Sequence, residues 1–232
     1  WGFIARYLNT FTRSGIDFIP QLLGAVLFWD FFSRVMMGIT TAFFEDVWSR
    51  NFLNLFASPL SISEYVTGLV MTSVLTSTIG LLVMLVLATS VFGLPVFAIG
   101  LQLIPVLLVL FLFGTALGVT ASAIVLRFGP ASEWLVWPIP ALLSPFAGVF
   151  YPLSTLPVWM QWVGRALPPS YVFEALRAML AQQPATGAGS SQLLAAGLAV
   201  LHLGLAGWLF AKVYRKAVRS GLLARYSAES VS

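Results

Sequence analysis

The chain has no cysteine, a single histidine and few charged residues. The absence of cysteine excludes disulfides, thiolate metal sites and cysteine nucleophiles, although it says nothing about the cellular compartment. Only 9% of the residues are charged, whereas about a quarter are charged in ordinary soluble domains. Because 59% are hydrophobic and the mean hydropathy is +0.94, a water-soluble core of 232 residues could not bury so much apolar surface. The composition therefore indicates an integral membrane protein.

Charged side chains and histidine are absent from the 62 residues between Tyr65 and Leu126. At about 1.5 Å per residue, one helix of that length would be about three times the ~30 Å thickness of the bilayer core. Gly93-Leu94-Pro95 interrupts the run near its middle, where a helix should stop and turn. The run is therefore predicted to form two transmembrane helices joined by a tight hairpin. The spans should be α-helical, because the alternating pattern of membrane β-strands is missing.

Charges and helix-breaking residues divide the chain into five predicted spans of an all-α integral membrane protein. Several prolines interrupt the fourth span, and a proline-rich, partly amphipathic stretch follows it. The chain starts at Trp1 without methionine, so we expect an upstream part of the protein to precede it. The predicted spans cover residues 19–44, 62–92, 96–126, 132–152 and 193–213, with a polar segment at 45–60, an outer surface region at 145–183 and a basic tail at 214–232.

The distribution of lysine and arginine predicts the orientation in the membrane, because cytoplasmic loops carry an excess of both. Seven of these residues lie on the side that holds the 45–60 segment and the C-terminus, and four lie on the other side. We therefore expect that segment and the C-terminus in the cytoplasm. The same bias accounts for the pI of about 9.8 without a nucleic-acid partner. The seven are Arg50, Arg127, Lys212, Arg215, Lys216, Arg219 and Arg225, and the four are Arg6, Arg13, Arg165 and Arg177.

The sequence contains no phosphate-binding loop. A Walker A loop needs a Gly-Lys pair whose lysine reaches the β- and γ-phosphates. The only lysines, Lys212 and Lys216, follow Ala211 and Arg215. The chain therefore cannot hydrolyse ATP alone, and we expect no catalytic residue, cofactor or metal site in it. His202 has no accompanying nucleophile motif or further metal ligand, so we expect it to form a hydrogen bond between helices.

Three stretches of the sequence carry proline and polar residues at characteristic positions. EDVWSRNFLNLFASPL at 45–60 starts with acidic residues and ends in Ser-Pro-Leu, GVFYPLSTLP covers 148–157, and LPPSYVFEALR covers 167–177. In order and spacing they resemble the coupling segment, the Gly-x-Phe-x-Pro…Leu-Pro signature and the Pro-x-x-Tyr…Arg ending of ABC-2 type transporter permeases. That family includes drug, lipid and polysaccharide exporters. The resemblance covers about residues 18–215, and the family's N-terminal interfacial helix and most of its first span are not seen.

The resemblance implies a fold of six helices per subunit, of which five are visible here, with short re-entrant helices on the outer side. It implies a homodimer in the cell membrane, such as a bacterial inner membrane. It also implies a separate ABC ATPase subunit that binds ATP and magnesium, whereas this chain binds no cofactor. We expect the first visible span and the fifth to form the dimer interface.

The 45–60 segment is implied to be the coupling helix that contacts the ATPase. Its large apolar residues fall at i, i+4, i+7 and i+8, which makes one apolar stripe on a helix. Such a stripe can bind in a groove on a soluble partner. The alternative is an interfacial helix that lies among lipid headgroups. The residues assigned to coupling are Glu45, Asp46, Trp48, Arg50, Phe52, Leu55 and Phe56.

The proline-rich region after the fourth span is implied to form the outer gate. A short surface helix is predicted around residues 158–166. Glu174 and Arg177 stand at i and i+3 and could form an ion pair, which contributes almost nothing to stability if it is exposed. The residues assigned to the gate are Phe150, Tyr151, Pro152, Pro157, Pro168, Tyr171, Glu174 and Arg177.

Asp30 and Arg34 stand one helical turn apart inside the first predicted span. Either charge at mid-bilayer costs about 2.5–3.5 kcal/mol, so we expect the two side chains to pair on a side that faces protein. They are assigned to the translocation path or to the dimer seam. The alternative is a structural ion pair between helices.

The expected function is that of an export permease powered by a partner ATPase, which moves an amphipathic substrate such as a lipid, a glycolipid or polysaccharide, or a drug-like molecule. An ion-coupled secondary carrier is one alternative. It would need a relay of buried ionisable groups, for which only Asp30, Arg34 and His202 are available. A non-catalytic membrane scaffold is the other alternative. The sequence does not identify the substrate.

Overall fold

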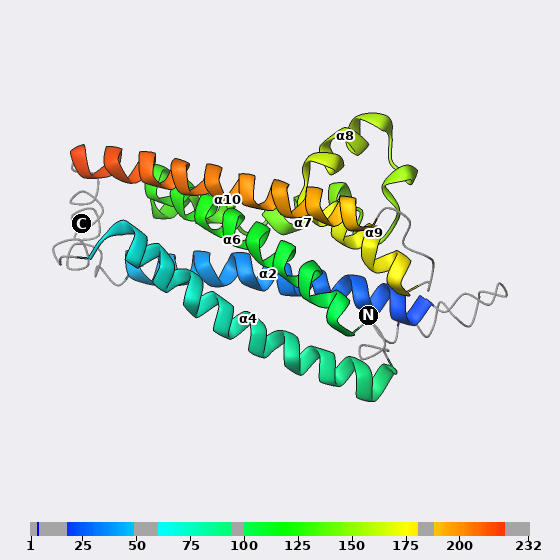
Figure 1. Cartoon of the computed structure of the whole chain (residues 1–232). Helices are drawn as coiled ribbons and strands as arrows, with labels where there is room; N and C mark the ends of the chain where they lie inside the picture. The colour runs from blue at the N-terminus through cyan, green and yellow to red at the C-terminus, as the bar shows by residue number, and fades with distance from the viewer. Residues whose placement is uncertain (1–3, 5–17, 49–59, 94–99, 181–187, 221–232) are drawn as a thin grey trace.

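The computed structural model describes residue 4 and residues 18–48, 60–93, 100–180 and 188–220, which contain helices, turns and caps but no strand. Residues outside these ranges are not described further. A short 3-10 helix, η1 (Gly100–Gln102), precedes the third long helix. The four long helices are α2 (Phe18–Trp48), α4 (Ile62–Phe92), α6 (Leu103–Phe128) and α10 (Ala188–Arg219) (Figure 1).

These four helices are long and apolar enough to cross a membrane, which confirms the predicted all-α membrane fold. The membrane candidates are Pro20–Val47, Ile62–Phe92, Gly100–Phe128 and Gly189–Arg219. The two halves of the charge-free run form α4 and α6. α4 has the predicted bounds, whereas α6 begins at Leu103 and not at residue 96, and residues 94–99 of the predicted hairpin lie outside the described residues.

Local capping fixes the bounds of α4. The Ser61 hydroxyl accepts a hydrogen bond from the backbone N–H of Glu64, and the Glu64 carboxylate accepts one from the backbone N–H of Ser61. This reciprocal capping box satisfies two donors that the first turn leaves free. At the other end Gly93 takes a left-handed conformation, with φ of 68°, and closes the helix.

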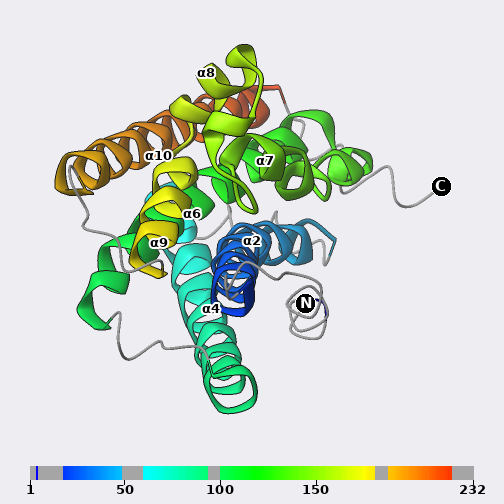
Figure 2. The same cartoon turned by 90° about the vertical axis from the view of Figure 1, so that its right-hand side faces the viewer.

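Three of the long helices, α2, α6 and α10, run in one direction and α4 runs in the opposite direction, which defines two ends of the bundle. The C-termini of α2, α6 and α10 and the N-terminus of α4 lie together at one end, which we call the Phe44 end after a residue of α2 (Figure 1). The opposite end carries the short helices α8 (Val158–Ala166) and α9 (Pro168–Leu180), and we call it the Arg177 end after a residue of α9. α2 packs against α4 and α6, and α10 packs against α6 and α9 (Figures 1 and 2).

Aromatic side chains dominate the core that joins these helices. Toward the Arg177 end, Phe32 of α2 stacks on Phe113 of α6 with ring centroids 5.6 Å apart. Toward the Phe44 end, Phe43 of α2 meets Phe210 of α10 edge to face at 6.1 Å. All four side chains are buried, and such pairs add about 0.5–1.5 kcal/mol each beyond the burial of their area.

Two glycines bring the backbones of α6 and α2 into close contact. A Cβ atom added at Gly114 would lie 3.1 Å from the carbonyl oxygen of Phe32, and one added at Gly118 would lie 2.9 Å from that of Met36. This Gly-x-x-x-Gly spacing puts both glycines on one face of α6. Close approach through small residues is a principal source of helix association in membranes, where no hydrophobic drive exists between helices.

The predicted fourth span, residues 132–152, is not a single helix. The chain instead forms a 3-10 helix, η2 (Pro130–Leu135), a turn, and the nine-residue helix α7 (Ile139–Ala147). Pro138 and Pro140 lack the N–H groups that would continue the helical ladder through the turn. The number of helices long enough to span is therefore four in the described part of the chain, rather than five.

The broken segment still runs along much of the bundle. Val136 packs in the core cluster of the Phe44 end, whereas Ala147 packs in the cluster of the Arg177 end. The first predicted span also needs a correction at its border, because α2 continues beyond residue 44 to Trp48. Glu45 and Asp46 are thus part of the last turns of α2 and not of a separate helix.

The short helices beyond α7 form a cap on the Arg177 end. α8 covers Val158–Ala166, which are the bounds predicted for the short surface helix. A 3-10 turn, η3 (Leu153–Thr155), connects α7 to it, and α9 follows directly. α7, α8 and α9 pack against one another, and α9 also packs against α2, α6 and α10.

Candidate functional site

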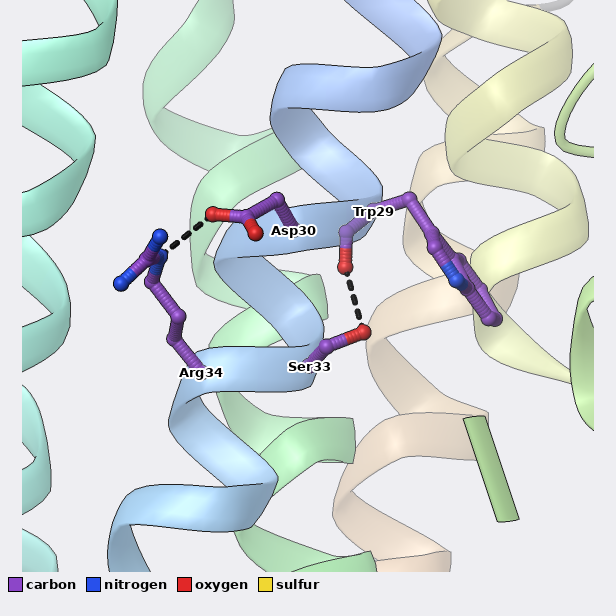
Figure 3. Close-up of polar contacts among 4 residues, drawn as sticks. All are labelled: Trp29, Asp30, Ser33 and Arg34. Atoms are coloured by element: carbon purple, nitrogen blue, oxygen red, sulfur yellow. Dashed lines mark hydrogen bonds and ion pairs between the residues drawn. The ribbon is translucent and has the colours of Figure 1, made fainter. Parts of the chain in front are cut away.

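Asp30 and Arg34 form an ion pair on one side of α2. The Nε–H of Arg34 donates to Oδ2 of Asp30, one helical turn away, and this is the one ion pair that joins two described residues. Figure 3 shows both side chains on one side of the helix and Trp29 on the other. The predicted pairing is therefore present. It joins residues of the same helix, however, and not residues of two helices.

The pair lies at the middle of the membrane-spanning part of α2 and is not enclosed by the subunit. Arg34 is 14 residues from Pro20 and 13 from Val47, which is about 20 Å from either end of the span. The side chain of Asp30 is 32% exposed and that of Arg34 is 50% exposed. Because charge in hydrocarbon costs about 2.5–3.5 kcal/mol, this surface requires water or another protein surface beside it.

α4 provides the space that the Arg34 side chain occupies. A Cβ added at Gly80 of α4 would lie 3.4 Å from Cδ of Arg34, so the absence of a side chain lets the arginine cross this position. About two helical turns nearer the Phe44 end of α4, the Ser73 hydroxyl donates to the carbonyl oxygen of Val35 at 2.8 Å. Ser77 lies between them with a buried hydroxyl oxygen that has no partner. The α2–α4 interface is therefore partly polar along its length.

The predicted gate residues lie in the cap, and Arg177 connects two of its helices. Nη1 of Arg177 on α9 donates to the carbonyl oxygen of Gly148 at 2.7 Å. Gly148 is the left-handed C-cap of α7, with φ of 61°, where carbonyl groups lack helical partners. A cation at a helix C-terminus also interacts favourably with the helix dipole. Arg177 thus fixes α9 to the end of α7.

Burial changes the properties of Arg177. It lowers the pKa of the guanidinium, and the negative charge of Glu174 partly opposes that shift. Nη2 of the same group is buried without a hydrogen-bond partner. The predicted ion pair between Glu174 and Arg177 does not form as a direct contact. Glu174 is exposed, and Arg177 turns toward Gly148 because the α7 carbonyl needs a donor.

Tyrosine and serine hydroxyl groups close further turns of the cap. Tyr151 donates to the carbonyl oxygen of Pro145 at 3.0 Å, and Tyr171 donates to that of Arg165 at 2.8 Å. The Ser170 hydroxyl donates to the carbonyl oxygen of Gly164 at 2.7 Å. Each bond joins residues on either side of a bend. The cap is therefore held in shape by its own hydrogen bonds.

The remaining gate residues mark helix starts or the surface of the cap. Pro152 and Pro157 directly precede η3 and α8, and Pro168 is the first residue of α9, where a missing N–H costs nothing. Phe150 is 44% exposed. Sequence reasoning grouped these residues through a motif, and the structure brings them together in one cap. The role of Gly148 as the acceptor for Arg177 was not predicted from the sequence, although this glycine belongs to the same motif.

Only part of the predicted coupling segment is described. Glu45 is exposed, and Asp46 accepts a hydrogen bond from the Tyr65 hydroxyl at 2.7 Å, which ties the end of α2 to the start of α4. These residues and Glu64 border a cleft of about 440 Å³ at the Phe44 end. Trp48 is the last residue of α2. The other residues assigned to coupling, Arg50, Phe52, Leu55 and Phe56, lie outside the described residues.

His202 packs inside the bundle without the expected bond to another helix. Its Nδ1 lies 2.8 Å from the carbonyl oxygen of Leu198, one turn earlier on α10. The imidazole meets the Phe113 ring of α6 edge to face at 5.3 Å. The prediction of a hydrogen bond between helices was therefore wrong, because the imidazole bonds to a carbonyl oxygen of its own helix. The contact between helices is an aromatic one.

Comparison with known proteins identifies a family. A model of the ABC-2 type transporter family matches residues 1–181, which include the polar segment, the hairpin and the cap. No curated protein matches the chain.

Proposed function

Because the chain belongs to the ABC-2 type transporter family and is a transmembrane subunit of an ABC-type transporter, we propose that it exports an amphipathic substrate across the cell membrane. In this proposal the subunit works as a homodimer with a separate ABC ATPase. The ATPase binds ATP and magnesium and moves the Phe44 end, while the cap at the Arg177 end acts as the outer gate. Lipids, glycolipids or polysaccharides, and drug-like molecules are the substrate classes considered.

The observation that carries the proposal is the half-exposed ion pair at mid-span. Asp30 and Arg34 are the only charged residues of α2 between Pro20 and Phe44. Ionisable residues within membrane spans almost always face the interior of the bundle or a water-filled cavity. This pair is open on one side of the subunit, where a polar path would border it. A substrate with a polar headgroup and an apolar tail could then interact with both the pair and the apolar helices.

The given residues contain no Gly-Lys pair for phosphate binding, so ATP would have to be bound outside them. In this proposal the separate ATPase supplies that site. The Phe44 end offers a place where such a partner could act. There Asp46 is tied to Tyr65, so a force on this end would reach both α2 and α4.

Transport in proteoliposomes tests the proposal directly. The chain is reconstituted with a candidate ABC ATPase, such as one that co-purifies with it, and movement of fluorescent lipids and drugs is measured with and without ATP. We expect ATP-dependent export that Asp30→Asn and Arg34→Gln each reduce at least tenfold. Glu133→Gln serves as the control, because this carboxylate is far in sequence from Asp30 and Arg34 and accepts a hydrogen bond only from the exposed Trp137 indole. Transport driven by an ion gradient without ATP would support the carrier instead, and absence of transport would support a scaffold.

Cysteine labelling separates a water-lined path from a dimer seam. Since the chain has no cysteine, Met37→Cys adds a single thiol on the face of Asp30, seven residues away, and leaves the ion pair intact. The control is Leu75→Cys on α4, whose native side chain is 64% exposed. A path predicts that a membrane-impermeant maleimide labels residue 37 and not residue 75, because the reactive thiolate requires water. Disulfide cross-linking of two subunits through residue 37 would place the pair at the dimer seam and contradict the path.

A further inference from the structure

A basic cleft lies between α6 and α10 at the Phe44 end. It encloses about 450 Å³. Its cationic wall consists of Arg127 from the end of α6 and of Lys212 and Lys216 from α10, and no acidic residue lines it. The apolar wall includes Leu126, Leu209 and Val213. The cleft therefore combines concentrated positive charge with hydrocarbon surface, a combination that neither the family match nor the proposed transport function explains.

The cleft stands where the uncharged part of both helices ends. α6 has no charged residue before Arg127, and α10 has none before Lys212. The two helices run in the same direction, so their first cations lie at the same end and border the same cleft. Lys216 lies one helical turn beyond Lys212, about 6 Å farther along the axis. The cations thus begin at the level where hydrocarbon gives way to headgroups.

Aromatic contacts support this placement. Nζ of Lys212 lies 4.8 Å from the ring centre of Trp208, which is 58% exposed. The Arg127 guanidinium lies 5.2 Å from the ring of Phe128, which is 63% exposed. Exposed tryptophan next to lysine is typical of the membrane interface, where the ring lies among headgroups and the lysine extends toward water. The cations therefore have their charged ends in the headgroup layer.

We propose that this cleft binds the phosphate headgroup of an anionic phospholipid. Arg127, Lys212 and Lys216 would contact the phosphate oxygens, and the acyl chains would lie along the apolar wall below them. A free phosphate ion would use the cations alone and leave the apolar wall without a role. An acidic protein surface is also less suited, because the cleft opens at the level of the lipid and not beyond it. The proposal concerns this chain alone and does not depend on export.

The test counts lipids bound to the full-length protein in mild detergent by native mass spectrometry. Phosphatidylglycerol is compared with phosphatidylcholine of the same acyl chains, for wild type, Lys212→Gln, Lys216→Gln and the double variant. A basic residue near an anionic surface contributes about 1 kcal/mol, which is about fivefold in affinity. We expect the preference for phosphatidylglycerol to fall about fivefold for each lysine removed, and to be unchanged by millimolar inorganic phosphate. Lys216→Glu should reject phosphatidylglycerol and still bind phosphatidylcholine.

Two controls separate this site from general positive charge. Arg215→Gln alters a cation on the same helix that does not line the cleft and donates to the Ala211 carbonyl oxygen. Arg165→Gln alters an exposed arginine stacked on Trp162 at the opposite end. Neither should change the lipid preference by more than about twofold. An equal loss in Arg215→Gln, displacement of the lipid by inorganic phosphate, or unchanged lipid binding in the double variant with loss of ATPase co-purification would each overturn the proposal.

Discussion

Replacing Gly118 by alanine should force α6 away from α2 and destabilise the protein. The new Cβ atom would lie 2.9 Å from the carbonyl oxygen of Met36 and 2.9 Å from Cβ of Ile39. Carbon atoms in good contact are about 3.5–4.0 Å apart, so the helices would have to separate by more than half an ångström. Neither atom can rotate away, because one belongs to the backbone and the other is fixed to it.

The expected loss is set by two opposing contributions. Adding a methyl group to a well-packed contact costs about 1–3 kcal/mol, and the two contacts under 3.0 Å at Gly118 put the cost in the upper part of that range, about 2–3 kcal/mol. Alanine in place of glycine regains up to about 1 kcal/mol through its higher helix propensity. The net effect of Gly118→Ala is therefore a loss of about 1–2 kcal/mol. Gly114→Ala should behave similarly, since its Cβ would lie 3.0 Å from the Val35 side chain and 3.1 Å from the Phe32 carbonyl oxygen.

Thermal unfolding in detergent, followed by tryptophan fluorescence, measures this loss. At about 2–4 °C per kcal/mol for a protein of this size, the midpoint should fall by about 2–8 °C. The control is Gly204→Ala on α10, where no atom lies within 4 Å of the added Cβ and the midpoint should stay the same or rise. If Gly118→Ala and Gly204→Ala unfold at the same temperature, the close approach of α6 and α2 is refuted.

Three further substitutions test the connections at the two ends of the bundle. Arg177→Gln should lower the free energy of unfolding by about 1.5–3 kcal/mol, because the charged donor to the Gly148 carbonyl is lost; the thermal midpoint measures it. Tyr65→Phe removes the donor to the Asp46 carboxylate and should cost a similar amount, seen as faster hydrogen exchange at the end of α2. Ser61→Ala removes the N-cap of α4 and should cost about 1 kcal/mol, seen as faster exchange in the first turn of that helix.

Two substitutions elsewhere in the chain serve as controls for the cap and for the start of α4. Arg165→Gln removes an exposed arginine of the cap and should leave the midpoint within about 0.5 kcal/mol of wild type. Ser90→Ala removes a hydroxyl that bonds only within its own helix and should not change exchange at the start of α4. Arg177→Gln with wild-type stability would mean that the bond to Gly148 does not hold the cap. Exchange that is unchanged in Tyr65→Phe or Ser61→Ala would likewise refute the contact concerned.

Patterns that act locally along the chain could be predicted from the sequence. The bounds of α4, residues 62–92, follow from the Ser61 cap and from Gly93, both of which are sequence signals. The Asp30–Arg34 pair follows from i,i+4 spacing and from the cost of charge in a membrane. Hydropathy did not predict the structure of the fourth span, because the apolar character of a stretch does not show whether its prolines divide it into separate short helices.

Contacts between distant segments could not be predicted in this way. Local spacing favoured a bond from Arg177 to Glu174, but the guanidinium bonds to the carbonyl oxygen of Gly148, 29 residues earlier. The free carbonyl at the end of α7 becomes a partner only when α9 folds against it. The role of Gly80 is similar, since nothing in the surrounding sequence indicates that an arginine of another helix will cross it.

The interfaces of α2 differ in how readily they can change. Against α6, backbone meets backbone at Gly118 and Met36, and such packing does not deform gradually. Against α4, the nearest atoms belong to side chains, to that of Arg34 at Gly80 and to that of Ser73 at Gly38. Because α4 packs chiefly on α2, its displacement would break fewer contacts than displacement of α6. A movement that widens access to Asp30 and Arg34 is therefore least costly between α2 and α4, the two helices that Asp46 and Tyr65 join at the Phe44 end.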